Sequence, residues 1–126
     1  MKRKVSKNRQ ELLENTINYF NSKNRGIELS NKENSLCFYY SDKTTKRCAI
    51  GIEVKKKTAM ALQEKNKPID CSSSFGLLPK RLQNMGKYFL RSIQELHDNH
   101  ENWTKTELSL QGKEVVKDIK KHYNLK

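Results

Sequence analysis

Four potential metal ligands are the first residues in this 126-residue chain whose types suit chemistry. They are two cysteines and two histidines, Cys37, Cys48, His97 and His100. Zinc binds thiolates and imidazoles, and histidines three residues apart share a helical face. The cysteines of a zinc site usually stand two to four residues apart, whereas ten residues separate these two. We therefore expect free thiols and no metal site.

The segment HDNHENW offers a second possibility, a metal-dependent nuclease. His97, Asp98, His100 and Glu101 are residue types that surround a divalent ion in such enzymes. The sequence around them does not predict the frame of strands and helices that such a site needs. The favoured interpretation is a polar helix end, followed by Trp103 folding back onto the core.

Cys71 precedes three serines, Ser72 to Ser74, and would be a nucleophile if a base stood beside it. A thiol without a positioned base is unreactive, and the sequence identifies no such base. A turn with capping hydroxyls is the simpler interpretation. Because a glycine-rich phosphate loop is also absent from the sequence, we expect no enzyme activity and no cofactor.

Positive charge is the strongest functional signal. The chain has 26 Lys and Arg against 14 Asp and Glu, a net charge of +12. Clustered cations attract phosphates and release their condensed counterions, so nucleic acid or a nucleoprotein complex is the expected partner. The cationic residues predicted to bind it are Lys55, Lys56, Lys57, Lys80, Arg81, Lys87 and Arg91.

Aromatic residues near these cations suggest a second kind of contact. Tyr39 and Tyr40 lie in the stretch CFYYSDKTTKRCAIG, and Arg47 follows them in the same stretch. Aromatic rings stack on bases, so we predict that these three residues form a binding edge, with Trp103 as a further stacking residue.

Length and composition predict one domain. At 126 residues with 34% hydrophobic residues, the chain suffices for a single core. We expect a basic N-terminal arm over residues 1–9 and one domain over 10–126. Three cysteines, the lack of an apolar run of about 20 residues and the lack of a signal peptide predict an intracellular protein without a membrane segment.

Apolar residues at helical spacing predict four main helices. In the strongest helix, which begins near Gly86, the apolar face is formed by Phe89, Ile93 and Leu96 and is widened by Tyr88 and Leu90. We expect the others to run from about Asn8 to Lys23, from Lys57 to Lys65 with Thr58 as a cap, and after the N-cap Ser109. A helical segment that begins at Pro79 either pauses at Gly86 or runs through it into the strongest helix.

Two extended segments predict a β-hairpin, residues 36–40 and 47–54, joined by a polar loop. In the second, Cys48, Ile50, Ile52 and Val54 alternate with Arg47, Ala49, Gly51 and Glu53, which predicts one inward and one outward face. Residues 26–29 are a candidate third strand. The expected fold class is α+β, with a hairpin or three-stranded antiparallel sheet packed against about four helices.

Several segments together, ELLENTINYFN, CFYYSDKTTKRCAIG, LLPKRLQNMGKYFLRSIQELHDNHENW and LSLQGKEVVKDIKKHYNL, resemble a family of small uncharacterised proteins of phages, prophages and their bacterial hosts. The resemblance covers residues 10 to 125. It implies a small accessory protein of a mobile element in the bacterial cytoplasm, and it assigns no activity to any residue.

These observations predict a non-enzymatic basic binding protein of a phage or mobile element. Its target would be nucleic acid or a nucleic-acid-dependent host machine, and inhibition of a host defence protein, as by an anti-CRISPR, fits that context. Two alternatives stay open. One is a protein that sequesters a nucleotide signal, with Arg47, Arg91 and Tyr40 in a pocket. The other is the nuclease at His97 and His100.

Overall fold

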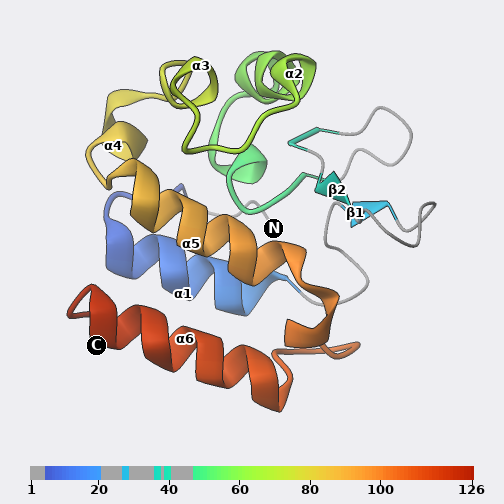
Figure 1. Cartoon of the computed structure of the whole chain (residues 1–126), viewed down its shortest axis with the longest axis vertical. Helices are drawn as coiled ribbons and strands as arrows, with labels where there is room; N and C mark the ends of the chain where they lie inside the picture. The colour runs from blue at the N-terminus through green and yellow to red at the C-terminus, as the bar shows by residue number, and fades with distance from the viewer. Residues whose placement is uncertain (1–4, 21–26, 29–35, 38, 41–46) are drawn as a thin grey trace.

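The computed structural model describes residues 5–20, 27–28, 36–37, 39–40 and 47–126 (Figure 1). Within these residues the chain forms six α-helices, two short 3-10 helices and one pair of two-residue strands. In chain order they are α1 (Arg9–Tyr19), β1 (Ile27–Glu28), β2 (Leu36–Cys37), η1 (Gly51–Glu53), α2 (Lys56–Lys65), α3 (Ser72–Phe75), α4 (Lys80–Gln83), α5 (Lys87–Asp98), η2 (His100–Asn102) and α6 (Leu110–His122).

The fold is an all-α small domain, so the predicted α+β class is wrong. β1 pairs antiparallel with β2, with Ile27 opposite Cys37, and these four residues are the only sheet in the described part of the chain. The expected strand over 47–54 is instead a turn followed by η1. Helix-like hydrogen bonds take the place of strand pairing there: the amide of Ile52 donates to the Cys48 carbonyl oxygen at 3.0 Å.

The alternation that predicted this strand does not match its burial. Ala49 and Glu53, expected on the outward face, are fully or almost fully buried, whereas Ile52, expected inward, is only half-buried. Cys48, Ala49 and Ile50 are consecutive and all inaccessible to solvent. A strand exposes alternate residues on opposite faces, so a tight turn buries these three side chains better.

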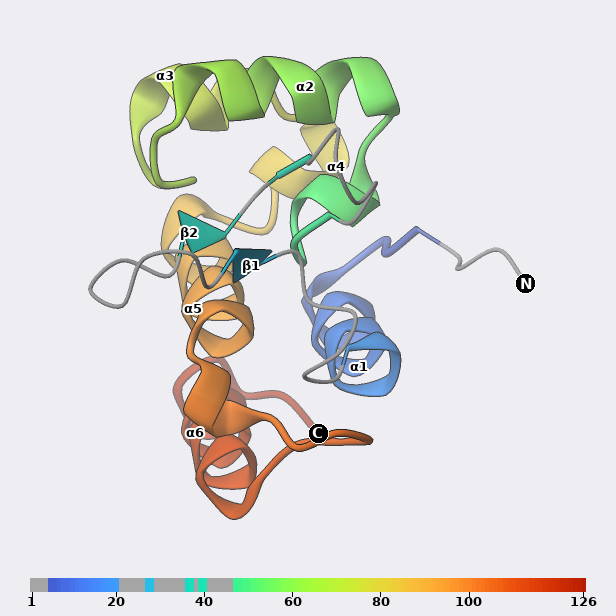
Figure 2. The same cartoon turned by 90° about the vertical axis from the view of Figure 1, so that its right-hand side faces the viewer.

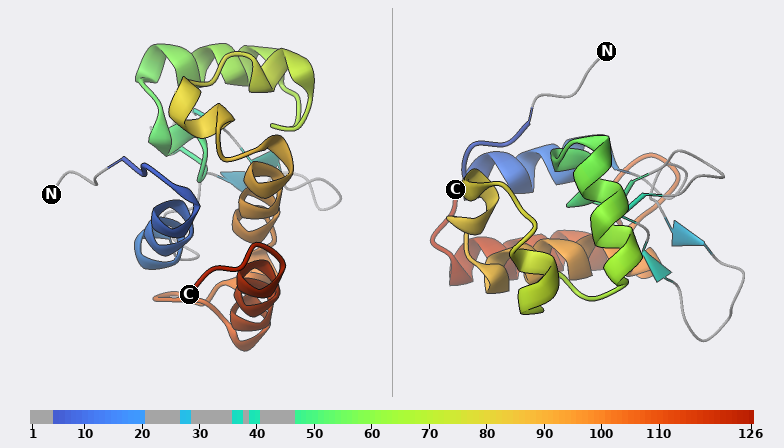
Figure 3. Two further views of the ribbon diagram at one scale, coloured as in Figure 1. Left: turned by 90° about the vertical axis from the view of Figure 1, so that its left-hand side faces the viewer. Right: turned by 90° about the horizontal axis from the view of Figure 1, so that it is seen from above.

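α5 is the centre of the core, and it packs against both α1 and α6. Its buried face consists of Phe89, Leu90, Ile93 and Leu96, as the helical spacing predicted. Tyr88 does not widen that face, because it is 68% exposed. Figures 2 and 3 show that α2 and α3 lie at one end of the molecule and α6 at the other, with α5 between them.

Helix boundaries follow local signals in part. Ser109 is the N-cap of α6, as predicted, and its hydroxyl accepts from the Gly112 amide at 3.0 Å. Lys55, not Thr58, is the N-cap of α2. α1 ends at Tyr19, short of the predicted Lys23, because Phe20 is extended and buries its ring.

α4 and α5 are separate helices. Pro79 is the N-cap of α4, one residue before the first-turn position expected for it. Gly86 separates the two helices. Its φ of 89° lies in the region that favours glycine. Among the described residues, no helix combines the length and the apolar character needed to cross a membrane.

Candidate nucleic-acid interface

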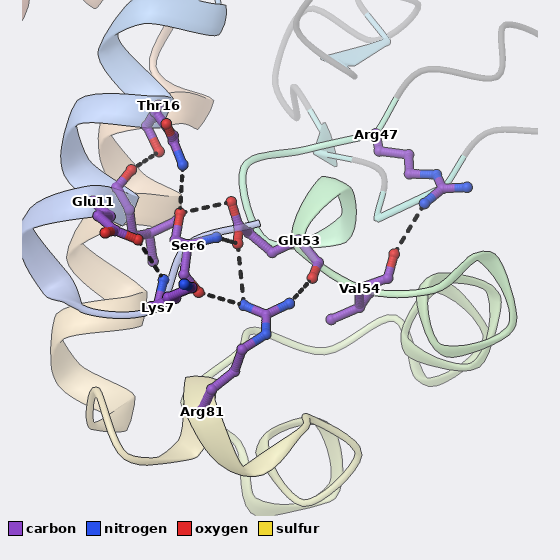
Figure 4. A network of polar contacts seen from close by, with 10 residues as sticks. Ser6, Lys7, Glu11, Thr16, Arg47, Glu53, Val54 and Arg81 are labelled. Carbon is purple, nitrogen blue, oxygen red and sulfur yellow. Dashed lines mark hydrogen bonds and ion pairs between the residues drawn. The ribbon is translucent and has the colours of Figure 1, made fainter. Parts of the chain in front are cut away.

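A buried ion pair organises the end of the molecule where the predicted cations lie. The Glu53 carboxylate is inaccessible to solvent and pairs with the Arg81 guanidinium at 3.2 Å (Figure 4). Ser6 donates to the same carboxylate twice, from its amide at 2.7 Å and from its hydroxyl at 2.9 Å. The buried charge is therefore both paired and hydrogen-bonded, as a buried carboxylate requires.

Arg81 is held by backbone as well as by Glu53. Its guanidinium donates to the Ser6 carbonyl oxygen at 2.8 Å and to the Glu53 carbonyl oxygen. Three parts of the chain meet at this side chain: the segment before α1, the 3-10 helix η1 and the helix α4 (Figure 4). Arg81, predicted as a binding residue, thus positions the segments around it.

α2 begins three residues after Glu53, and its start carries three exposed lysines. Lys55 is the N-cap, and Lys56 and Lys57 are the first two helical residues. The Lys55 side chain forms no capping bond to the helix. The amides of a first helical turn carry partial positive charge, which adds to that of the lysines. This end of α2 therefore attracts anions.

Tyr40 holds Arg47 beside the start of α2. The guanidinium carbon of Arg47 lies 5.5 Å from the centre of the Tyr40 ring, and the Lys56 ammonium lies 5.4 Å from it. Arg47 also donates to the Val54 carbonyl oxygen at 3.1 Å. These contacts fix two cations over one ring at the beginning of α2.

Gly51 allows this arrangement, because the backbone at Tyr39 passes directly over it. A Cβ atom at position 51 would lie 2.0 Å from the Tyr39 carbonyl oxygen. We expect Gly51→Ala to lower the free energy of unfolding by about 1–3 kcal/mol, since backbone must move to relieve the overlap. Chemical denaturation measures the change. Gly76→Ala is the matched control, because its Cβ would approach the Ser72 carbonyl oxygen no closer than 3.2 Å. Equal stability of the two variants would contradict the close approach.

A pocket of about 590 Å³ joins the start of α2 to the start of α4. Its lining residues are Val5, Glu53, Val54, Lys55, Thr58, Leu77, Leu78, Pro79 and Arg81. The segments 55–57 and 80–81, predicted separately from the sequence, are thereby brought together. Lys80 is exposed between the lining residues Pro79 and Arg81.

We define the α2 surface as these six cationic residues: Arg47, Lys55, Lys56, Lys57, Lys80 and Arg81. Segments 47–58 and 77–81, which supply them, contain a single carboxylate, that of Glu53. Since Arg81 neutralises Glu53, five cations are left, and none of the five forms an ion pair with a described residue.

The two remaining predicted cations lie on α5. Lys87 is exposed, with its ammonium 5.4 Å from the centre of the Tyr88 ring. Arg91 pairs with Glu95 at 2.9 Å and with Asp70 at 3.7 Å. The hydrogen bond to Glu95 raises the pKa of Arg91 above its ordinary value. The charge of Arg91 is thus already balanced by two carboxylates.

The predicted stacking residues are mostly part of the core. Tyr39 is 4% exposed, and its hydroxyl donates to the Lys67 carbonyl oxygen at 2.8 Å. Trp103 is 5% exposed, folded back onto the core as expected, and its indole donates to the Leu96 carbonyl oxygen at 3.1 Å. Tyr40 is 9% exposed beneath its two cations. A base has no access to these rings. The exposed aromatic beside a lysine is Tyr88, which the helical periodicity assigned to the core.

The candidate metal ligands are dispersed. Cys48 is a buried free thiol, and His97 is buried in edge-to-face contact with Phe20, with Nδ1 3.0 Å from Asp98. The side chain of Cys37 lies outside the described residues. Within the described part of the chain, no three His, Cys, Asp or Glu residues gather in a way that suits a metal ion.

Cys71 is a half-buried free thiol at the N-cap of α3. The three serines that follow it form the first residues of that short helix, and Ser74 donates to the Lys67 carbonyl oxygen at 3.4 Å. These contacts are those of a local turn.

Comparison with protein-family models, with curated proteins and with solved structures found no match for this chain. The resemblance to small phage proteins, and the counter-defence role that it implies, therefore stay predictions.

Proposed function

We propose that this protein is a non-enzymatic binding protein whose α2 surface contacts the phosphates of nucleic acid. The observation that carries the proposal is the convergence of three separate cationic segments, at 47, 55–57 and 80–81, around the start of one helix. A single carboxylate accompanies them, and Arg81 neutralises it.

The chemistry of the surface suits a phosphate-bearing polyanion. Its exposed lysines are point charges that contact phosphate oxygens without fixed geometry, and they release counterions when a polyanion binds. The positive end of α2 adds donor amides at the same place. Neither feature selects a base sequence, so the binding is sequence-tolerant.

Titration of a short fluorescein-labelled oligonucleotide with the purified protein tests this proposal. We expect a saturable rise in anisotropy at low ionic strength. Unlabelled oligonucleotide of unrelated sequence should displace the labelled one, because phosphate contacts carry no base information. Bovine serum albumin at equal concentration controls for non-specific anisotropy. An unchanged anisotropy across the titration would contradict the proposed function.

A further inference from the structure

The pocket beside the α2 surface has walls that phosphate binding alone does not explain. Val54, Leu77, Leu78 and Pro79 make one part of its lining apolar, and Val5 closes it from the N-terminal segment. Val5 is 51% exposed and Leu77 is 37% exposed. Exposed apolar side chains around a concave site are typical of ligand binding.

The charges around this pocket decide its occupant. Lys55 stands on the α2 side, and Pro79–Arg81 with exposed Lys80 stands on the α4 side. In a nucleic-acid strand, each nucleoside has one backbone phosphate before it and one after it. Cations on two sides of an apolar pocket match that arrangement.

We propose that the pocket accepts one unstacked base of a single-stranded nucleic acid while the lysines on both sides contact the neighbouring phosphates. This inference rests on the proposed function and adds the class of ligand. The volume of the pocket, about 590 Å³, is in the range of small-molecule sites. The Thr58 hydroxyl in its lining offers a donor and an acceptor to the edge of a base.

A pocket for one unstacked base distinguishes single-stranded from double-stranded nucleic acid. Bases in a duplex are paired and stacked, and taking one out costs a few kcal/mol, whereas bases in a single strand are free to turn outward. The pocket therefore favours single strands over duplexes of equal phosphate number. DNA and RNA share this chemistry, so both are included as single strands in the test.

The experiment compares three ligands with equal numbers of phosphates: a single strand, tested as DNA and as RNA, a duplex of half its length, and a single strand with abasic positions. With wild-type protein, we expect the single strand to bind about tenfold more tightly than the abasic strand, the size of one lost base contact. Leu77→Ser removes an apolar wall and is expected to lower single-strand affinity by a similar factor, with duplex affinity unchanged. Met60→Ser is the matched control, because Met60 is also an exposed apolar residue, at 44%, but does not line the pocket.

The outcomes separate the two proposals. Equal affinity for the single strand, the duplex and the abasic strand overturns the base pocket and leaves the phosphate surface standing. No binding of any of the three overturns both. The wild-type comparison with the abasic strand needs no variant, so a folding defect in Leu77→Ser does not affect it. Tight binding of an acidic peptide that excludes the oligonucleotide from wild type, and not from Leu77→Ser, would assign the pocket to a protein partner and overturn the base pocket.

Discussion

Replacing Arg81 by alanine is expected to lower the free energy of unfolding by about 3 kcal/mol, the lower end of the range for breaking a buried ion pair. The substitution removes the Arg81 guanidinium from the fully buried Glu53 carboxylate. The two bonds from Ser6 stay in place, and Arg81 is itself 27% exposed, which is why we expect the lower end. Chemical denaturation or a thermal melting shift of roughly 10 °C measures the loss.

Lys80→Ala is the matched control for Arg81→Ala. It removes the same charge from the neighbouring residue, which is exposed and forms no ion pair with a described residue. We expect a change within about 0.5 kcal/mol there, as for most surface substitutions. Adding Glu53→Gln to Arg81→Ala should restore part of the stability, because a neutral amide is less costly to bury than a carboxylate that has lost the Arg81 guanidinium. Equal losses at positions 80 and 81 would show that the pair does not organise this end of the molecule.

Nucleic-acid affinity is expected to fall about a hundredfold between roughly 50 mM and 200 mM salt. The estimate follows from the five cations of the α2 surface that Glu53 does not neutralise. For a single strand, the logarithm of the binding constant falls by about 0.7 per contact for each tenfold rise in salt, which gives a slope near −3.5. Anisotropy titrations at four or more salt concentrations measure it.

Chloride and acetate salts should give similar slopes if cation release from the nucleic acid is the main contribution. A binding constant that stays level over this salt range would mean that phosphate contacts contribute little, and the function would then have to rest on uncharged contacts.

Much of the helical part of the fold is predictable, because local sequence determines it. Phe89, Ile93 and Leu96 recur at helical spacing and face the core, and Ser109 has both the side chain and the position of an N-cap. Helix ends are less predictable. α1 stops at Tyr19 because the ring of Phe20 packs against His97, a residue distant in sequence.

The incorrect strand over 47–54 shows where sequence patterns fail. Its alternation assigned Glu53 to a solvent-facing position, but the carboxylate is buried against partners from distant segments, Arg81 and Ser6. Gly51 adds a close contact with the backbone of Tyr39 that no periodicity encodes. Such long-range contacts override local strand preference.

The candidate site was predictable in its parts and not in its assembly. The cations of 55–57 and 80–81 are evident as sequence clusters, but only the fold brings one member of each, Lys55 and Arg81, to the lining of one pocket. The sequence contains no sign that Arg81 pairs with an internal carboxylate or that the charge of Arg91 is balanced by Glu95. It also misplaced the exposed ring of Tyr88.

The most direct test of the α2 surface compares two triple variants with the same net charge. Lys55, Lys56 and Lys57 are changed to glutamine in one, and Lys113, Lys117 and Lys120 in the other. The second set lies on α6, at the end of the molecule opposite α2 (Figure 1). Glutamine and lysine have similar helix propensity, and thermal melting confirms that both variants fold.

The measured quantity is the salt dependence of oligonucleotide binding. We predict that the slope of the α2 variant shrinks by about two, since three of five contacts are lost at about 0.7 each, and that its affinity at low salt falls tenfold or more. The α6 variant should keep the wild-type slope. Equal slopes for the two variants, or a larger loss in the α6 variant, would contradict the assignment of nucleic-acid binding to the α2 surface.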